Sequence, residues 1–65
     1  MEDNKRALLR RIIGEYHDMP GVTLTAVQAR RLHGLSADVC DGLYRELVNS
    51  GELCLRPDGR YSLPD

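Results

Sequence analysis

The first part of the chain places its apolar residues at helical spacing. Between Asn4 and His17 they recur at intervals of three and four, at Ala7, Leu8, Leu9, Ile12, Ile13 and Tyr16. Because an α-helix repeats every 3.6 residues, this spacing predicts an amphipathic helix over about residues 4–17. The Asp18-Met19-Pro20-Gly21 segment ends it, since proline disfavours helix in the residue before it and glycine tolerates a turn.

A second, shorter helix is predicted over about residues 25–33. Before it, Val22-Thr23-Leu24 alternates briefly and predicts a very short strand. Thr25 and Gln28 have the spacing of a capping box, in which both side chains satisfy free backbone N–H groups at a helix start. The helix would have a modest apolar face of Ala26, Ala29 and Leu32, and Gly34 would end it.

A third helix is predicted over about residues 36–50. Ser36 is a suitable N-cap, and Gly51 supplies the left-handed residue that closes many helices. Its apolar stripe consists of Cys40, Leu43, Tyr44, Leu47 and Val48. We expect all three tyrosines, Tyr16, Tyr44 and Tyr61, to be core side chains with polar tips, in a chain that lacks Phe and Trp.

The end of the chain changes from helical to alternating periodicity. Leu53 and Leu55 alternate with polar neighbours, as do Tyr61 and Leu63, and the segment 56–59 has the Arg-Pro-Asp-Gly sequence of a turn. This pattern predicts a hairpin over about residues 52–63 with one apolar face, which carries Leu53, Leu55, Tyr61 and Leu63, and one polar face.

Composition limits what such a chain can do. Its 65 residues are 42% hydrophobic and 29% charged, which is typical of one small folded domain over residues 1–65. No pair of nucleophile and base or glycine-rich phosphate loop is present, so we predict neither an enzyme nor a small-molecule substrate. No window is apolar enough to span a membrane, and the start from Met1 to Lys5 is polar, so we expect a cytoplasmic protein.

The cysteines and histidines do not predict a metal site. Cys40, Cys54, His17 and His33 lack the paired spacing of zinc ligands, so we predict no metal and no cofactor. Cys40 belongs to an apolar stripe, whereas Cys54 is expected on the polar face of the hairpin, which disfavours a disulfide between them. We expect His33 to be a turn or half-buried residue.

The order of these elements resembles the winged helix-turn-helix superfamily. The resemblance runs through Thr25, Gly34-Leu35-Ser36, Leu43 with Leu47, Gly51 and Asp58-Gly59-Arg60-Tyr61. It implies an α+β winged helix, in which three helices form a helix-turn-helix and the hairpin is the wing. It also implies a recognition helix over residues 36–50 that enters the major groove of double-stranded DNA, as in a small transcriptional regulator.

The resemblance assigns DNA contacts to six residues. Arg45 and Asn49 would act from the recognition helix and Arg56 and Arg60 from the wing, while Arg30 and Arg31 would contact phosphates. Two registers remain open for the second helix. With Thr25 as cap, Arg30 and His33 fall where the family carries a small and an apolar residue; a shift by one gives those roles to Ala29 and Leu32 and lengthens the turn.

The charge pattern leaves a second function open. The net charge is −1, and the outward positions of the third helix include Asp38 and Asp41, which would face the DNA polyanion. The alternative is a winged helix that binds a protein partner without binding DNA. Its docking surface would be this acidic face or the basic first helix with Arg10 and Arg11, and a homodimer is one such possibility.

Overall fold

A computed structural model describes residues 2–64 of the chain, and the side chains from Asn4 onward. Its elements follow the order α1 (Glu2–Asp18), β1 (Leu24–Thr25), α2 (Ala26–His33), α3 (Ala37–Asn49), β2 (Cys54–Leu55) and β3 (Arg60–Ser62). This is the predicted α+β winged-helix layout, with three helices and a C-terminal hairpin. The helix boundaries lie within two residues of the predicted ones. Within residues 2–64, no helix is both long and apolar enough to cross a membrane.

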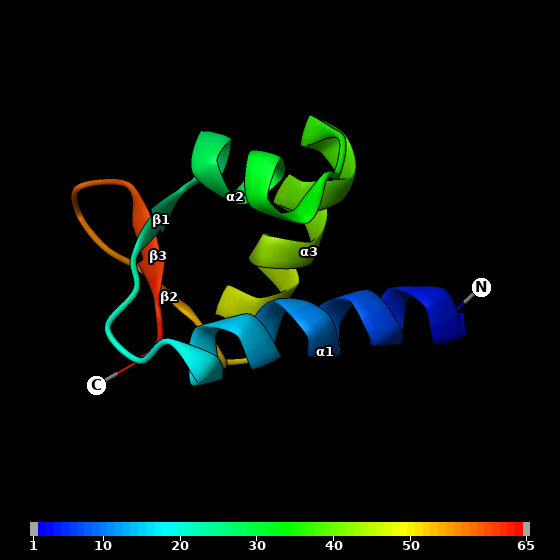
Figure 1. Ribbon diagram of the computed structural model, residues 1–65, viewed down its shortest axis with the longest axis horizontal. Coiled ribbons are helices and arrows are strands. Elements are labelled where there is room, and N and C mark those ends of the chain that lie inside the picture. The colour runs from blue at the N-terminus through cyan, green and yellow to red at the C-terminus, as the bar shows by residue number, and fades with distance from the viewer. Residues whose placement is uncertain (1, 65) are drawn as a thin grey trace.

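The core lies where α1, α2, α3 and the sheet meet. In Figure 1, α1 runs along one edge of the molecule, α2 and α3 lie above it, and the sheet is at the end opposite the N-terminus. The fully buried side chains come from all three helices and from the segment before β2: Ile12, Tyr16, Ala29, Cys40, Tyr44, Leu47 and Leu53. The two amphipathic stripes predicted for α1 and α3 supply most of them, because each stripe faces the other.

The wing belongs to a three-stranded antiparallel sheet of order β1-β3-β2. The predicted short strand is present, shifted to Leu24–Thr25, and Leu24 pairs with Tyr61 of β3. On the other edge of β3, Leu55 of β2 also pairs with Tyr61. The sheet therefore ties the wing directly to the start of α2, since Thr25 is both the last residue of β1 and the N-cap of α2.

The caps of α2 are the predicted ones, whereas its buried positions match neither of the two registers in full. Thr25 Oγ1 accepts from the backbone N–H of Gln28, and Gln28 Oε1 accepts from that of Thr25, which completes the capping box. Gly34 ends the helix with φ 66°, a conformation that favours glycine. The buried residues of α2 are Ala29, which has the small role in the shifted register, and His33, which has the apolar role with Thr25 as cap, so the structure combines the two. The prediction that Leu32 belongs to the apolar face was wrong, because its side chain is 46% exposed.

The predicted two faces of the hairpin were also partly wrong. Leu53 is buried, but its backbone N–H bonds Leu47 O, so it belongs to the turn that closes α3 and not to a strand. Leu55 is 53% exposed, whereas Ser62, expected on the polar face, is 3% exposed. Strands of two and three residues are too short for side-chain alternation to define two faces. In its buried position, Ser62 Oγ accepts a hydrogen bond from Arg56 Nε at 2.8 Å.

Candidate functional site

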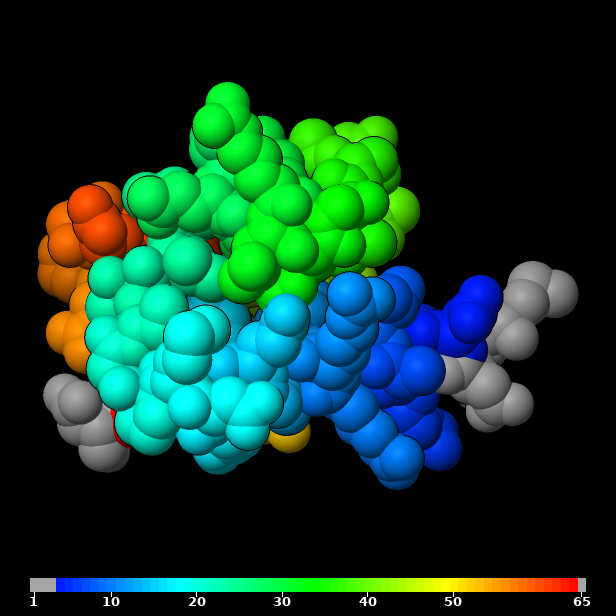
Figure 2. All heavy atoms as spheres, in the orientation of Figure 1, coloured from blue at the N-terminus to red at the C-terminus, as the bar shows by residue number. Residues whose placement is uncertain are grey.

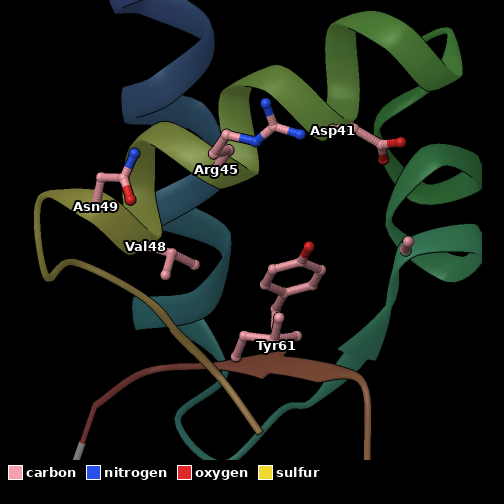
Figure 3. Close-up of a pocket in the computed structure, with 7 residues that line it drawn as sticks. Asp41, Arg45, Val48, Asn49 and Tyr61 are labelled. Carbon is pink, nitrogen blue, oxygen red and sulfur yellow. The ribbon is translucent and has the colours of Figure 1, made fainter.

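A concavity of about 340 Å³ opens between α3, the start of α2 and the wing (Figure 3). Its lining combines polar residues of α3 with apolar ones from α2, α3, β2 and β3: Ala26, Asp41, Arg45, Val48, Asn49, Leu55 and Tyr61. In the close-up, Tyr61 points from β3 toward α3, and the polar side chains of α3 stand along the opposite side. The part of the chain after residue 24 thus builds the whole lining.

Arg45 and Asn49 form the exposed polar edge of this concavity. They are four residues apart on α3, so they occupy the same face of the helix, and both are exposed. Across from them, Tyr61 is held by edge-on packing against Tyr44, with ring centroids 4.8 Å apart. The structure therefore brings together two predicted DNA contacts and places them next to the wing.

Arg30 and Asp41 join α2 to α3 by an ion pair. Arg30 Nη2 donates to both carboxylate oxygens of Asp41, at 3.2 Å to Oδ1 and 2.9 Å to Oδ2. The two side chains are 33% and 45% exposed, so the pair lies at the edge of the concavity and not in the core. Arg30, predicted as a phosphate contact, is thereby engaged within the protein, and the charge of Asp41 is balanced in place.

The two arginines of the wing also have partners within the protein. The turn is closed by the backbone N–H of Arg56, which donates to Arg60 O at 2.8 Å, and Gly59 there has φ 85°. The Arg56 side chain reaches back to Ser62. Arg60 is exposed, and its Nε lies 3.8 Å from Asp58 Oδ2 at the wing tip.

The remaining predicted site residues lie apart from the concavity. Arg31 is exposed between the buried residues Ala29 and His33, on the opposite side of α2. Arg10 and Arg11 are exposed on α1. Asp38, exposed in the first turn of α3, stands on the outer face one turn before Asp41. The structure thus gathers Arg30, Asp41, Arg45 and Asn49 and separates Arg31, Arg10 and Arg11 from them.

The side chain of His33 is part of a buried polar chain, not of a half-exposed turn. The Tyr16 hydroxyl donates to the Tyr44 oxygen at 3.2 Å, and the Tyr44 oxygen lies 2.8 Å from His33 Nε2. On the other side of the ring, Nδ1 is 2.8 Å from Glu15 Oε2, although the two are not aligned as a hydrogen bond. This buried polar chain of side chains connects α1, α2 and α3.

Burial is the main cause of the pKa shifts of the side chains in this polar chain. It lowers the pKa of His33, an effect that the positive charge of Arg11 reinforces and the carboxylate of Glu15 opposes. Burial likewise raises the pKa of Tyr16 and of Tyr44. Since Tyr44 accepts from Tyr16, its own proton is available to His33 Nε2, which leaves the Nδ1–H facing Glu15.

Cys40 lies where the sequence predicts it, whereas Cys54 does not. Cys40 is buried in the core, and burial raises the pKa of its thiol. Cys54 is half-buried next to Ser62, and both thiols are free. Among the residues that the structure describes, no three His, Cys, Asp or Glu side chains are grouped so as to hold a metal ion.

The apolar part of the site was not predicted from the sequence. Val48 packs against the core, as the stripe of α3 predicts, and also lines the concavity, whereas Leu55, assigned to the core face of the hairpin, is exposed and lines it too. For Val48 the signal was available, since it follows Asp41 and Arg45 at helical spacing. For Leu55 no such signal was available, because the alternation of the hairpin assigned it to the apolar face that packs on the core.

A scan against protein-family models gives no match, and comparisons with curated protein sequences and with solved structures give none either.

Proposed function

We propose that the protein is a winged helix that binds double-stranded DNA through α3 and the wing. The observation that carries the proposal is the position of Arg45 and Asn49 next to each other on the exposed edge of α3, beside the wing. Arginine makes bidentate hydrogen bonds to guanine and asparagine to adenine in the major groove. A helix that presents both side chains one turn apart has the donors that base recognition needs.

The ion pair between Arg30 and Asp41 supports this proposal. Asp41 alone would repel phosphate, but its carboxylate receives two hydrogen bonds from Arg30, so the edge of the concavity carries no net charge there. Arg45 then provides a positive charge on α3, and at the wing Arg60 is exposed, with Asp58 Oδ2 3.8 Å from its Nε. Asp38 remains as the acidic residue of the outer face that has no basic partner in the described chain.

The test is a titration of the protein with a mixed-sequence duplex at low salt, followed by fluorescence anisotropy. Arg45→Ala is compared with Arg10→Ala, because both remove one positive charge from an exposed helical position but only Arg45 lines the concavity. We expect Arg45→Ala to weaken binding by about tenfold, as for the loss of a base contact, and Arg10→Ala to have a smaller effect. Equal losses would mean that binding depends on overall charge, and absence of binding to the wild type would contradict the proposal.

One observation favours a second candidate function, the binding of a protein partner. Leu55 is 53% exposed and lines the concavity with Val48 and Tyr61, which gives the site an apolar wall that DNA phosphates do not need. Leu55→Ser distinguishes the two functions: DNA affinity should stay within about twofold, whereas binding of a protein partner should be lost. Val27→Ser, on the exposed side of α2 with 52% exposure, is the matched control.

A further inference from the structure

Tyr61 differs from the other two tyrosines of the chain in what its hydroxyl contacts. The Tyr16 hydroxyl donates to Tyr44, and the Tyr44 oxygen lies 2.8 Å from His33 Nε2, so both groups are engaged inside the core. The Tyr61 hydroxyl has no hydrogen-bond partner among residues 4–64. In Figure 3 it points toward α3 across the concavity that the ring lines. A tyrosine combines an apolar ring with a polar tip that needs a partner, so the concavity is where we expect one.

The ring of Tyr61 is held firmly by its surroundings. Tyr61 lies in the central strand β3, where it pairs with Leu24 on one side and Leu55 on the other. Its ring packs edge-on against Tyr44, which is 1% exposed, with ring centroids 4.8 Å apart. A donor that is fixed in this way loses little conformational entropy when it binds. The hydroxyl is therefore preorganised for a ligand that enters the concavity.

The position of this hydroxyl relative to α3 indicates the chemistry of the ligand. An α-helix with its side chains is about 10–12 Å across and the major groove is about 12 Å wide, so a helix in the groove has a phosphodiester backbone along each side. Tyr61 stands across the concavity from Arg45 and Asn49, the two residues proposed to reach the bases. It therefore faces the border of the groove, where phosphate oxygens are the acceptors within reach. Tyrosine hydroxyls are among the side-chain groups that donate to them.

The shape and charge around the concavity permit a phosphate there. Figure 2 shows the wing, in orange, at one end of the molecule, and in this view α1, in blue, does not cover it. Among the lining residues Asp41 is the acidic one, and Arg30 Nη2 donates to both of its carboxylate oxygens. Arg45 adds a positive charge on the side opposite Tyr61. An anion beside the Tyr61 hydroxyl thus meets a balanced carboxylate and a guanidinium.

We infer that the Tyr61 hydroxyl donates a hydrogen bond to a backbone phosphate of the bound duplex from the wing side of the concavity. The inference rests on the proposed DNA binding and adds a contact to it: α3 reads the bases, whereas Tyr61 fixes the position of one strand. Because the acceptor belongs to the backbone, the contact is independent of base sequence. Because the phenol is uncharged, the contact releases no counterion from the DNA.

Anisotropy titrations of Tyr61→Phe with two duplexes, one rich in G·C pairs and one rich in A·T pairs, test the inference. The variant keeps the ring and loses the hydroxyl, so we expect its affinity for both duplexes to fall by about tenfold. The dependence of its affinity on salt concentration should equal that of the wild type. Tyr16→Phe is the matched control, because it removes a hydroxyl that lies in the core and not in the concavity, and it should leave duplex affinity unchanged. Circular dichroism checks that each variant is folded.

Arg45→Ala in the same titrations separates failure of the inference from failure of the proposed function. If Arg45→Ala weakens binding but Tyr61→Phe binds as tightly as the wild type, the Tyr61 contact is wrong and DNA binding through α3 stands. A loss confined to one duplex would indicate a base contact, and equal losses for Tyr16→Phe would indicate an effect on the core; either result overturns the inference. A wild type that binds neither duplex contradicts the proposed function, and the inference with it.

Discussion

His33 Nε2 lies 2.8 Å from the hydroxyl oxygen of Tyr44, and this contact joins the end of α2 to the middle of α3 inside the core. Tyr16 of α1 extends it, since its hydroxyl donates to Tyr44 at 3.2 Å. His33 immediately precedes Gly34, the residue that ends α2 and begins the turn to α3. The polar chain therefore fixes how the two helices of the helix-turn-helix meet.

Stability should fall as the solution becomes acidic, because His33 is buried in its neutral form. Its pKa in the folded state is lowered, mainly by burial, so between that value and 6.5 the unfolded chain binds more protons than the folded one. The free energy of unfolding is then fully retained above about pH 6.5 and decreases as pH falls below it. Each unit of pKa depression corresponds to about 1.4 kcal/mol at full protonation. Urea denaturation between about pH 5 and pH 8 measures this dependence.

Two variants test whether His33 causes that dependence. His33→Gln should reduce the slope of stability against pH in this window, although it lowers stability at pH 7 by disturbing the polar chain. His17→Gln, at an exposed position of α1, is the matched control for the removal of one histidine. If both variants keep the wild-type slope, another group is responsible.

Tyr44→Phe should destabilise the protein by about 1–3 kcal/mol, because it leaves His33 Nε2 and the Tyr16 hydroxyl without their buried partner. Tyr61→Phe is the matched control, since Tyr61 is half-buried and keeps its ring packing against Tyr44 in the variant. We expect it to change the free energy of unfolding by less than about 0.5 kcal/mol. Equal losses for the two variants would show that the polar chain contributes nothing beyond ring packing.

The helices were predictable because each has a long apolar stripe or a local cap. Tyr16, Leu43 and Leu47 are buried where the 3.6-residue period places them, and Thr25 caps α2 through atoms three residues apart. Local sequence contains both signals. The fold class follows from them, since the order of the elements is readable along the chain.

Contacts between distant residues were not predictable in the same way. His33 and Glu15 are 18 positions apart, and nothing in the local pattern of either one indicates that they meet in the core. Arg30 was predicted as a phosphate contact, and nothing in the sequence indicates that it pairs with Asp41 on another helix. The prediction of the two hairpin faces was wrong for a related reason. Strands of two and three residues are positioned by neighbouring elements more than by their own alternation.

Leu55→Ser should leave stability almost unchanged, which distinguishes it from a core leucine. Leu55 is more than half exposed, so the substitution removes little buried apolar surface, and we expect a change of less than about 0.5 kcal/mol. Leu53→Ala should cost about 2–5 kcal/mol, because Leu53 is 2% exposed and leaves a cavity. Thermal unfolding of both variants checks the contrast, and a large loss for Leu55→Ser would mean that the wing packs more closely than described.

The ion pair between Arg30 and Asp41 should contribute little to folding but should influence DNA binding. Since both side chains are about one third to one half exposed, a double-mutant cycle with Arg30→Ala and Asp41→Ala should give a coupling of about 0.5 kcal/mol. Asp41→Ala removes a negative charge and releases Arg30 toward solvent, so we expect duplex affinity to rise by about fivefold at low salt. In the Arg30→Ala background the same substitution should give a smaller gain, because no arginine is released. Anisotropy titrations of the four proteins measure both effects. If Asp41→Ala lowers duplex affinity instead, Asp41 acts as an acceptor in the contact, as expected for recognition of a cytosine amino group, and the ion pair does not restrain Arg30.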